Sequence, residues 1–149
     1  MHNQNNCNQE EIAEIVTMSK QYEDECKSDF FNGATETEIQ EFEQKNEITI
    51  PEEYKNWLRF SDGGEIFYTL VQFYGVAHKP FIKVTNTGLP EDLVLIGSYI
   101  GDGQYICFSK TNGNIVRFDH GEIIDVDSLK AFLRVNVIDF AKRDIEELI

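Results

Sequence analysis

Five residues in the second half of the chain have the right types to bind a metal ion. They are Asp102, Asp119, His120, Asp125 and Asp127. Carboxylates and imidazoles are common ligands of catalytic metals, but several of them must converge on one point. Asp119 and His120 lie at an expected turn, and Asp127 suits the cap of a helix. These local roles explain the pattern, so we expect no metal site and no cofactor.

Nucleophilic catalysis has little support in the sequence. Cys107 falls inside a predicted strand, where a buried structural thiol is the usual role of cysteine. His78 and His120 have the chemistry of a general base, but no G-x-S-x-G element accompanies them. The Gly101–Gly103 segment lacks the context of a phosphate-binding loop and is better explained as a turn. We therefore expect a protein that is not an enzyme.

The net charge of the chain indicates which classes of binding partner are favourable. The chain has 149 residues with 13 Lys and Arg against 27 Asp and Glu, a formal net charge of −14. Residues 1–62 hold 15 of the acidic residues but only 5 of the basic ones. Such a surface repels phosphate backbones and anionic lipid head groups. We expect no direct binding to nucleic acid or membranes, and a basic protein surface as the partner.

Three cysteines at long spacings, without C-x-x-C, argue against a disulfide framework and a zinc ribbon. The N-terminus has no basic segment followed by an apolar one, and no apolar run has the length of a membrane span. These features predict a soluble protein of a reducing compartment, the cytoplasm.

The first half of the chain has helical patterns. After an Asn/Gln-rich segment, residues 1–9, which we expect to be disordered, an apolar stripe begins at Ile12. Thr35 and Glu38 form a predicted capping box at the start of the next helix. Pro51 suits the first position of a third helix, which Ser61-Asp62-Gly63-Gly64 ends.

Strand patterns follow. The sequence predicts one strand over 66–74 and further strands over 93–96, 104–108, 115–118 and 123–126, then a helix from Ser128. Asn112-Gly113 is a strong hairpin signal, and His120-Gly121 offers another tight reversal. Short turns between successive strands indicate an antiparallel meander. We predict an α+β fold, with residues 10–149 forming a single domain.

Several segments together resemble the SUKH superfamily, which includes fungal cell-wall-assembly regulators and many bacterial immunity proteins. They are Ala34–Glu43, Ile50–Tyr54, Trp57-Leu58, Asp62–Gly64, Phe73–Val76, Ile96-Gly97, Gly101–Gly103, Tyr105–Phe108, Val116–His120 and Ser128–Leu133. The resemblance covers residues 33–133. It implies a single α+β domain without an active site.

The resemblance also implies a function. Bacterial members commonly bind and neutralise a cognate toxin domain of polymorphic or contact-dependent systems, often a nuclease. A nuclease is basic around its substrate cleft, which suits an inhibitor of charge −14. We therefore predict an immunity protein that acts by stoichiometric occlusion. The alternative is a regulatory protein-interaction module related to the cell-wall-assembly regulators.

The binding surface is expected on or beside the sheet. Exposed tyrosines beside carboxylates have the composition of an interaction hot spot. The predicted partner-binding residues are Glu65, Tyr68, Tyr74, Asp102 and Asp119.

Overall fold

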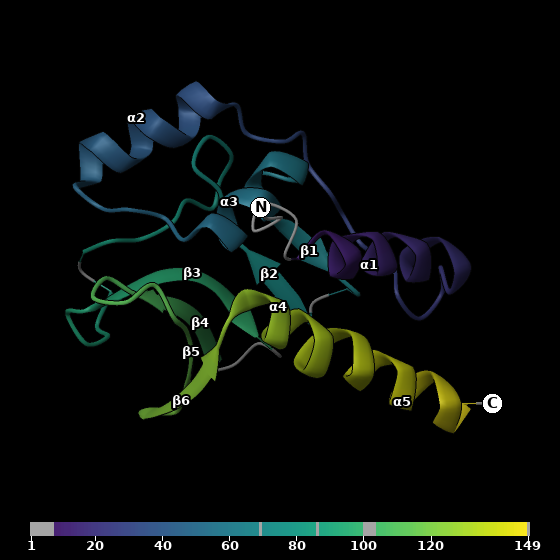
Figure 1. Ribbon diagram of the computed structural model, residues 1–149. Coiled ribbons are helices and arrows are strands. Elements are labelled where there is room, and N and C mark those ends of the chain that lie inside the picture. Colours follow the sequence, from purple (N-terminus) through teal and green to yellow (C-terminus); the bar gives the residue numbers. More distant parts are fainter. Residues whose placement is uncertain (1–7, 69, 86, 100–103, 149) are drawn as a thin grey trace, which may run out of the picture.

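The computed structural model describes residues 8–68, 70–85, 87–99 and 104–148 (Figure 1). The elements are α1 (Gln9–Gln21), α2 (Glu36–Asn46), α3 (Glu52–Phe60), β1 (Gly64–Ile66), β2 (Val71–Phe73), β3 (Leu93–Tyr99), β4 (Gln104–Ser109), β5 (Ile115–Asp119), β6 (Glu122–Asp127), α4 (Leu129–Ala131), η2 (Phe132–Asp139) and α5 (Phe140–Leu148). Helices, then strands, then a C-terminal helix confirm the predicted α+β class.

The helix starts follow local side-chain chemistry. The predicted capping box is present: Thr35 Oγ1 accepts from the Glu38 amide at 3.1 Å, and Glu38 Oε1 accepts from the Thr35 amide at 2.9 Å. Pro51 lies just before the first residue of α3, one position earlier than predicted. The apolar face of α3 is buried, including Tyr54 and Trp57.

Within the described ranges, six strands form one antiparallel sheet in the order β1-β2-β3-β4-β5-β6. The predicted meander is confirmed, but the single strand expected over 66–74 is wrong. The chain reverses between β1 and β2, with φ of 52° at Phe67 and 62° at Tyr68. Aromatic residues are typical of strands and rarely adopt positive φ. The sequence pattern at Phe67 and Tyr68 therefore indicated a strand and not a turn.

Two other predicted reversals are found, and the turn predicted at Gly101–Gly103 lies outside the described residues. Residues 109–114 form the β4–β5 turn, where the Gly113 amide donates to the Ser109 carbonyl at 2.8 Å. Between β5 and β6, Asp119 pairs with Glu122, and His120 and Gly121 have φ of 50° and 95°. Two consecutive positive φ values define a type I′ hairpin turn, and glycine adopts the second without steric cost.

The main core lies between the helices and one face of the sheet. Trp57 is fully buried, with its ring centroid 5.1 Å from that of Phe73 and 5.3 Å from that of Phe60. The second face of the sheet carries a smaller apolar cluster of Leu93, Leu95, Cys107 and Val116. The sheet is therefore apolar on both faces.

The C-terminal helix changes winding along its length. Between α4 and α5, η2 has π-helical hydrogen bonding, which is rare as an extended segment. The Tyr99 hydroxyl donates to the Asn136 carbonyl in this segment at 2.7 Å. Arg134 forms ion pairs with Glu11 and Glu14 of α1, both at 3.0 Å. These contacts place α1 and the C-terminal helix side by side (Figure 1).

The N-terminal segment predicted to be disordered overlaps the start of the fold. Asn8 is fully buried and donates through Nδ2 to the Glu53 carbonyl at 2.9 Å, and α1 begins at Gln9. Residues 1–7 lie outside the described ranges. No helix in those ranges has the length and apolar character needed to cross a membrane.

Candidate functional site

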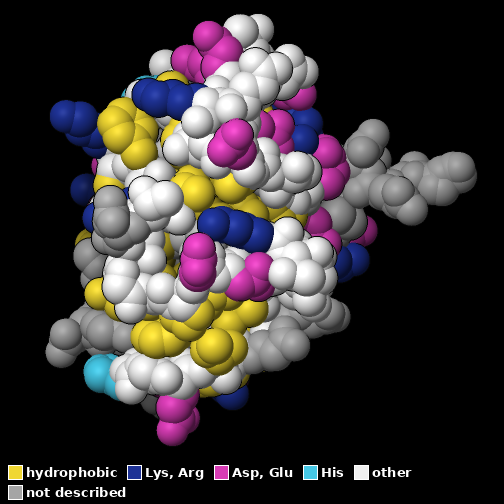
Figure 2. Space-filling model, turned by 90° about the vertical axis from the view of Figure 1, so that its left-hand side faces the viewer, with side chains coloured by type: hydrophobic (Ala, Val, Ile, Leu, Met, Phe, Trp, Pro, Cys, Tyr) yellow, Lys and Arg dark blue, Asp and Glu magenta, His cyan; other side chains and the backbone are white. Residues whose placement is uncertain are grey.

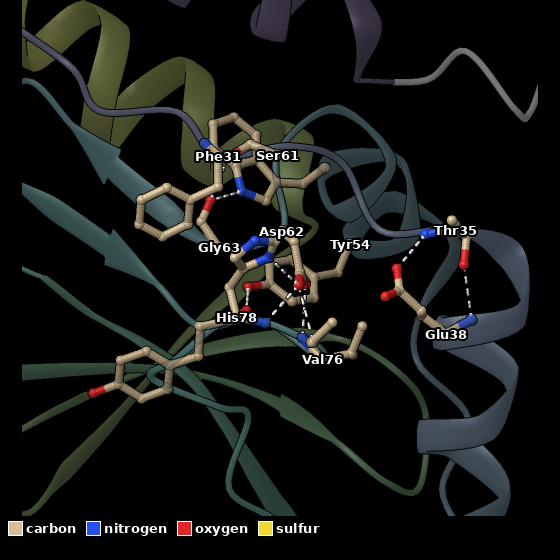
Figure 3. Close-up of polar contacts among 12 residues, drawn as sticks. Phe31, Thr35, Glu38, Tyr54, Ser61, Asp62, Gly63, Val76 and His78 are labelled. Atoms are coloured by element: carbon tan, nitrogen blue, oxygen red, sulfur yellow. Dashed lines mark hydrogen bonds and ion pairs between the residues drawn. The ribbon is translucent and has the colours of Figure 1, made fainter.

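Two of the sequence motifs, Asp62–Gly64 and Phe73–Val76, meet at one buried carboxylate, that of Asp62 (Figure 3). Asp62 is fully buried at the end of α3 and accepts hydrogen bonds from three successive amides after β2. The distances are 2.7 Å to Val76, 2.9 Å to Ala77 and 2.8 Å to His78, whose Nδ1 also lies 2.9 Å from Asp62 Oδ2. Asp62 therefore fixes the path of residues 76–78.

The neighbours of Asp62 are equally constrained. The Ser61 hydroxyl accepts from the Phe31 amide at 3.0 Å and donates to the Gly63 carbonyl at 2.8 Å. A Cβ on Gly75 would lie 2.6 Å from Asp62 Oδ1, so this position accommodates only glycine. The Asp-Gly-Gly motif thus has a structural role and does not by itself form a binding site.

Much of the acidic helix surface is also used internally. Arg59 forms ion pairs with Glu36 and Glu52, both at 2.7 Å, and Lys55 lies 3.3 Å from Glu43. These contacts pair three glutamates of α2 and α3 with basic side chains that the net charge of −14 already counts.

The second face of the sheet offers a continuous surface. The strand register aligns one residue from each strand in a row that runs from β1 to β6: Glu65, Gln72, Ser98, Tyr105, Phe118 and Ile123. We call these six residues the cross-sheet row. None of them is fully buried, and 56% of the Ile123 surface is exposed. Figure 2 shows hydrophobic side chains at the molecular surface, with charged side chains scattered among them.

The cross-sheet row changes character along its length. Its β1–β3 end is polar, whereas its β4–β6 end is apolar, and Tyr105 and Phe118 pack against the cluster that contains Cys107 and Val116. Tyr74 joins this face, since it packs against the same cluster. Burial, with smaller contributions from nearby Tyr105 and Cys107, raises the pKa of Tyr74, so its hydroxyl stays a hydrogen-bond donor. An apolar centre with polar neighbours is typical of a protein-binding surface.

The structure brings together only part of the predicted site. Glu65 and Tyr74 share the second face of the sheet. Tyr68 lies in the β1–β2 turn, where its hydroxyl donates to the Asp24 carbonyl at 2.7 Å. Asp119 alternates with Phe118 and therefore points to the opposite face. Asp102 lies outside the described residues.

Sequence reasoning missed five residues of the row: Gln72, Ser98, Tyr105, Phe118 and Ile123. The sequence shows that these residues alternate with apolar ones. It does not show which residues of neighbouring strands are paired, because that register depends on the unpredicted turn between β1 and β2. The register of the sheet, and not the residue types, identifies the row.

The groups considered for catalysis have other surroundings. Cys107 is fully buried, and burial raises the pKa of its thiol to about 12, which keeps it protonated at neutral pH. His120 Nδ1 contacts the neighbouring Asp119 carboxylate at the exposed β5–β6 turn. Over the residues that the structure describes, no three His, Cys, Asp or Glu side chains are grouped to hold a metal ion.

Comparison with known proteins identifies the family of the chain. A search of curated proteins finds no match. A family model, described as SMI1 / KNR4 family (SUKH-1), matches residues 33–135. The match includes α2, α3, the whole sheet and the start of the C-terminal helix. The chain therefore belongs to the SMI1/KNR4 family (SUKH-1), which confirms the resemblance seen in the motifs of residues 33–133.

Proposed function

We propose that the protein is an immunity protein that binds a cognate secreted toxin domain in the cytoplasm and blocks it by occlusion. The observation that carries this proposal is the cross-sheet row, a partly exposed surface that extends over all six strands and has Ile123 as its most exposed side chain. Family membership supports it, because SUKH proteins are protein-interaction modules. The inhibitor needs no catalytic group, only a stable complex.

The charge favours a basic toxin, and a nuclease domain in particular. A nuclease attracts its polyanionic substrate with Lys and Arg, and an inhibitor of net charge −14 competes for the same surface. Electrostatic attraction of this kind mainly raises the association rate. The apolar end of the row, Tyr105, Phe118 and Ile123, would then supply the desolvated contact that slows dissociation.

The test begins with affinity capture of the tagged protein from the cells that produce it, eluted with a salt gradient. The recovered toxin domain is then purified and its activity is titrated with the protein. We expect activity to fall linearly and to vanish at one equivalent. A toxin domain that stays active at equimolar ratio would refute the immunity role. Recovery of an envelope-synthesis protein instead would support the regulatory alternative.

A matched pair of variants tests the surface. Ile123→Asp places a charge in the cross-sheet row, and Val135→Asp places one on the C-terminal helix. The two side chains are similarly exposed, at 56% and 54%. We expect Ile123→Asp to weaken inhibition at least tenfold and Val135→Asp to leave it unchanged. Equal inhibition by both variants would exclude the row as the interface.

A further inference from the structure

A pocket away from the cross-sheet row lies between the β1–β2 turn, the segment after α1 and the start of α5. Its volume is about 250 Å³, and its apolar lining includes Cys26, Phe67, Leu70, Phe140, Ala141 and Ile145. Small-molecule sites usually have volumes of about 300–1,000 Å³. This pocket is smaller, and its size suits one long side chain.

Three carboxylates stand at the edge of this pocket. Asp24, Glu25 and Asp144 line it and are exposed. Burial, followed by the charges of Glu25 and Asp144, raises the pKa of the Cys26 thiol to about 11. Both carboxylates line the same pocket as this thiol. None of the three forms an ion pair with a side chain that the structure describes.

An aromatic ring completes the pocket. Tyr68 is 48% exposed, and the hydrogen bond from its hydroxyl to the Asp24 carbonyl fixes one end of the side chain. A fixed aromatic ring beside carboxylates attracts a cation through its π face, and guanidinium groups are the commonest partners. Among the described residues that line the pocket there is no lysine or arginine.

We propose that this pocket binds a single arginine or lysine side chain of the partner protein. The aliphatic stem would pack on Phe67, Phe140 and Ile145, while the charged head would reach Asp24 and Asp144 beside Tyr68. The inference rests on the proposed function only in that the partner is a basic protein. It adds a second contact, separate from the cross-sheet row, that selects for one protruding basic residue.

Charge complementarity favours this occupant over the alternatives. A neutral apolar side chain would fill the floor but leave three carboxylates at its edge without compensation. A second copy of this chain carries a net charge of −14 and is repelled at long range. A basic side chain has an aliphatic stem that packs on the apolar floor and a positive charge that compensates the carboxylates at the edge.

The pocket can be tested with small probes before the partner is known. Nα-acetyl-arginine amide is titrated into the ¹⁵N-labelled full-length protein at low salt, and the amide shifts of Cys26, Phe67 and Ala141 are followed by NMR. Nα-acetyl-citrulline amide has nearly the same shape without the charge and is the matched ligand. We expect the arginine probe to shift these amides and to bind at least fivefold more tightly than citrulline.

Variants show whether the binding is specific. Asp24→Asn and Asp144→Asn should each weaken the arginine probe about two- to fivefold, the range for exposed ion pairs. Tyr68→Asn keeps a residue that tolerates positive φ but removes the ring, and should weaken the probe similarly. Glu91→Gln changes an exposed carboxylate that does not line the pocket and should have no effect.

Three results would overturn the inference. They are equal binding of citrulline, binding that Asp24→Asn and Asp144→Asn leave unchanged, and self-association through the same amides. None of them bears on toxin inhibition, which the titration described above tests separately. If the probe binds but no toxin is inhibited, the pocket stands and the immunity role fails.

Discussion

Removal of the Asp62 carboxylate tests whether one buried group organises the junction of α3 and the segment after β2. In Asp62→Asn, one acceptor oxygen is replaced by an NH₂ group, which faces either the amide of Val76, at the Oδ1 position, or the amides of Ala77 and His78, at the Oδ2 position. A hydrogen bond to a charged group contributes about 1.5–3 kcal/mol, and such contributions are not additive within one network. The substitution leaves at least one buried amide without an acceptor, which costs about 1–3 kcal/mol, so we expect a loss of about 2–3 kcal/mol.

This loss is a large part of the stability of an ordinary domain, about 5–15 kcal/mol. Urea unfolding followed by the fluorescence of Trp57, the single tryptophan, measures it, because this side chain is fully buried in the core. Hydrogen exchange of the amides at residues 76–78 gives a local readout. These amides should exchange faster in the variant even under conditions where the molecule stays folded.

The matched control is Asp92→Asn. Asp92 also accepts several hydrogen bonds, from the Ser109 hydroxyl and from the amide and hydroxyl of Thr111, but it is exposed. Water can replace these bonds, so its loss should be much smaller. If the two variants lose the same stability, burial of Asp62 does not matter and the reasoning is refuted.

Three further changes have defined outcomes. Glu47 has φ of 54° at the end of α2, a conformation that glycine adopts without steric cost. Glu47→Gly should therefore raise the free energy of unfolding, measured by urea titration, by about 0.5–1 kcal/mol. An equal gain for Glu47→Ala would contradict this explanation. Burial raises the pKa of the thiols of Cys26 and Cys107 to about 11 and 12. Both thiols should therefore resist alkylation in the folded protein at about pH 8 and react together on unfolding, as measured by mass spectrometry. Rapid labelling of the folded protein would contradict this. The hydrogen bond from Lys142, with a smaller contribution from Arg134, lowers the pKa of Glu14 from its usual value of about 4.5. The Glu14 carboxylate therefore stabilises the fold above about pH 4.5, and this stabilisation is lost as the pH falls through its folded-state pKa. Lys142→Met should therefore make stability less dependent on pH below about 4.5, and an unchanged pH profile would contradict the assignment.

Short-range features of the fold were predictable from the sequence because their causes are local. The capping box of Thr35 and Glu38 involves residues three positions apart, and the His120-Gly121 turn involves neighbours. The reversal at Phe67 and Tyr68 was missed because neither residue is typical of positive φ. It is held by contacts distant in sequence, including the Tyr68 amide with the Lys27 carbonyl.

The candidate site was less predictable for the same reason. Glu65 and Tyr74 were chosen by composition, and they share a face because the β1–β2 turn sets the register. Asp119 was chosen alongside them, but side-chain alternation in β5 turns it to the opposite face. The Asp62 network joins residues fourteen to sixteen positions apart, beyond the range of local pattern rules.

The meander has a consequence for the order in which the molecule assembles. Every strand pairs with its neighbour in sequence, so each step of sheet formation closes only a short loop, except for the connection between β2 and β3. The contact of α1 with the C-terminal helix, through Glu11 and Arg134, instead joins opposite ends of the chain. The sheet, and with it the cross-sheet row, can therefore form one strand at a time. The contact between the two terminal helices closes a much longer loop and has the largest entropic cost of closure.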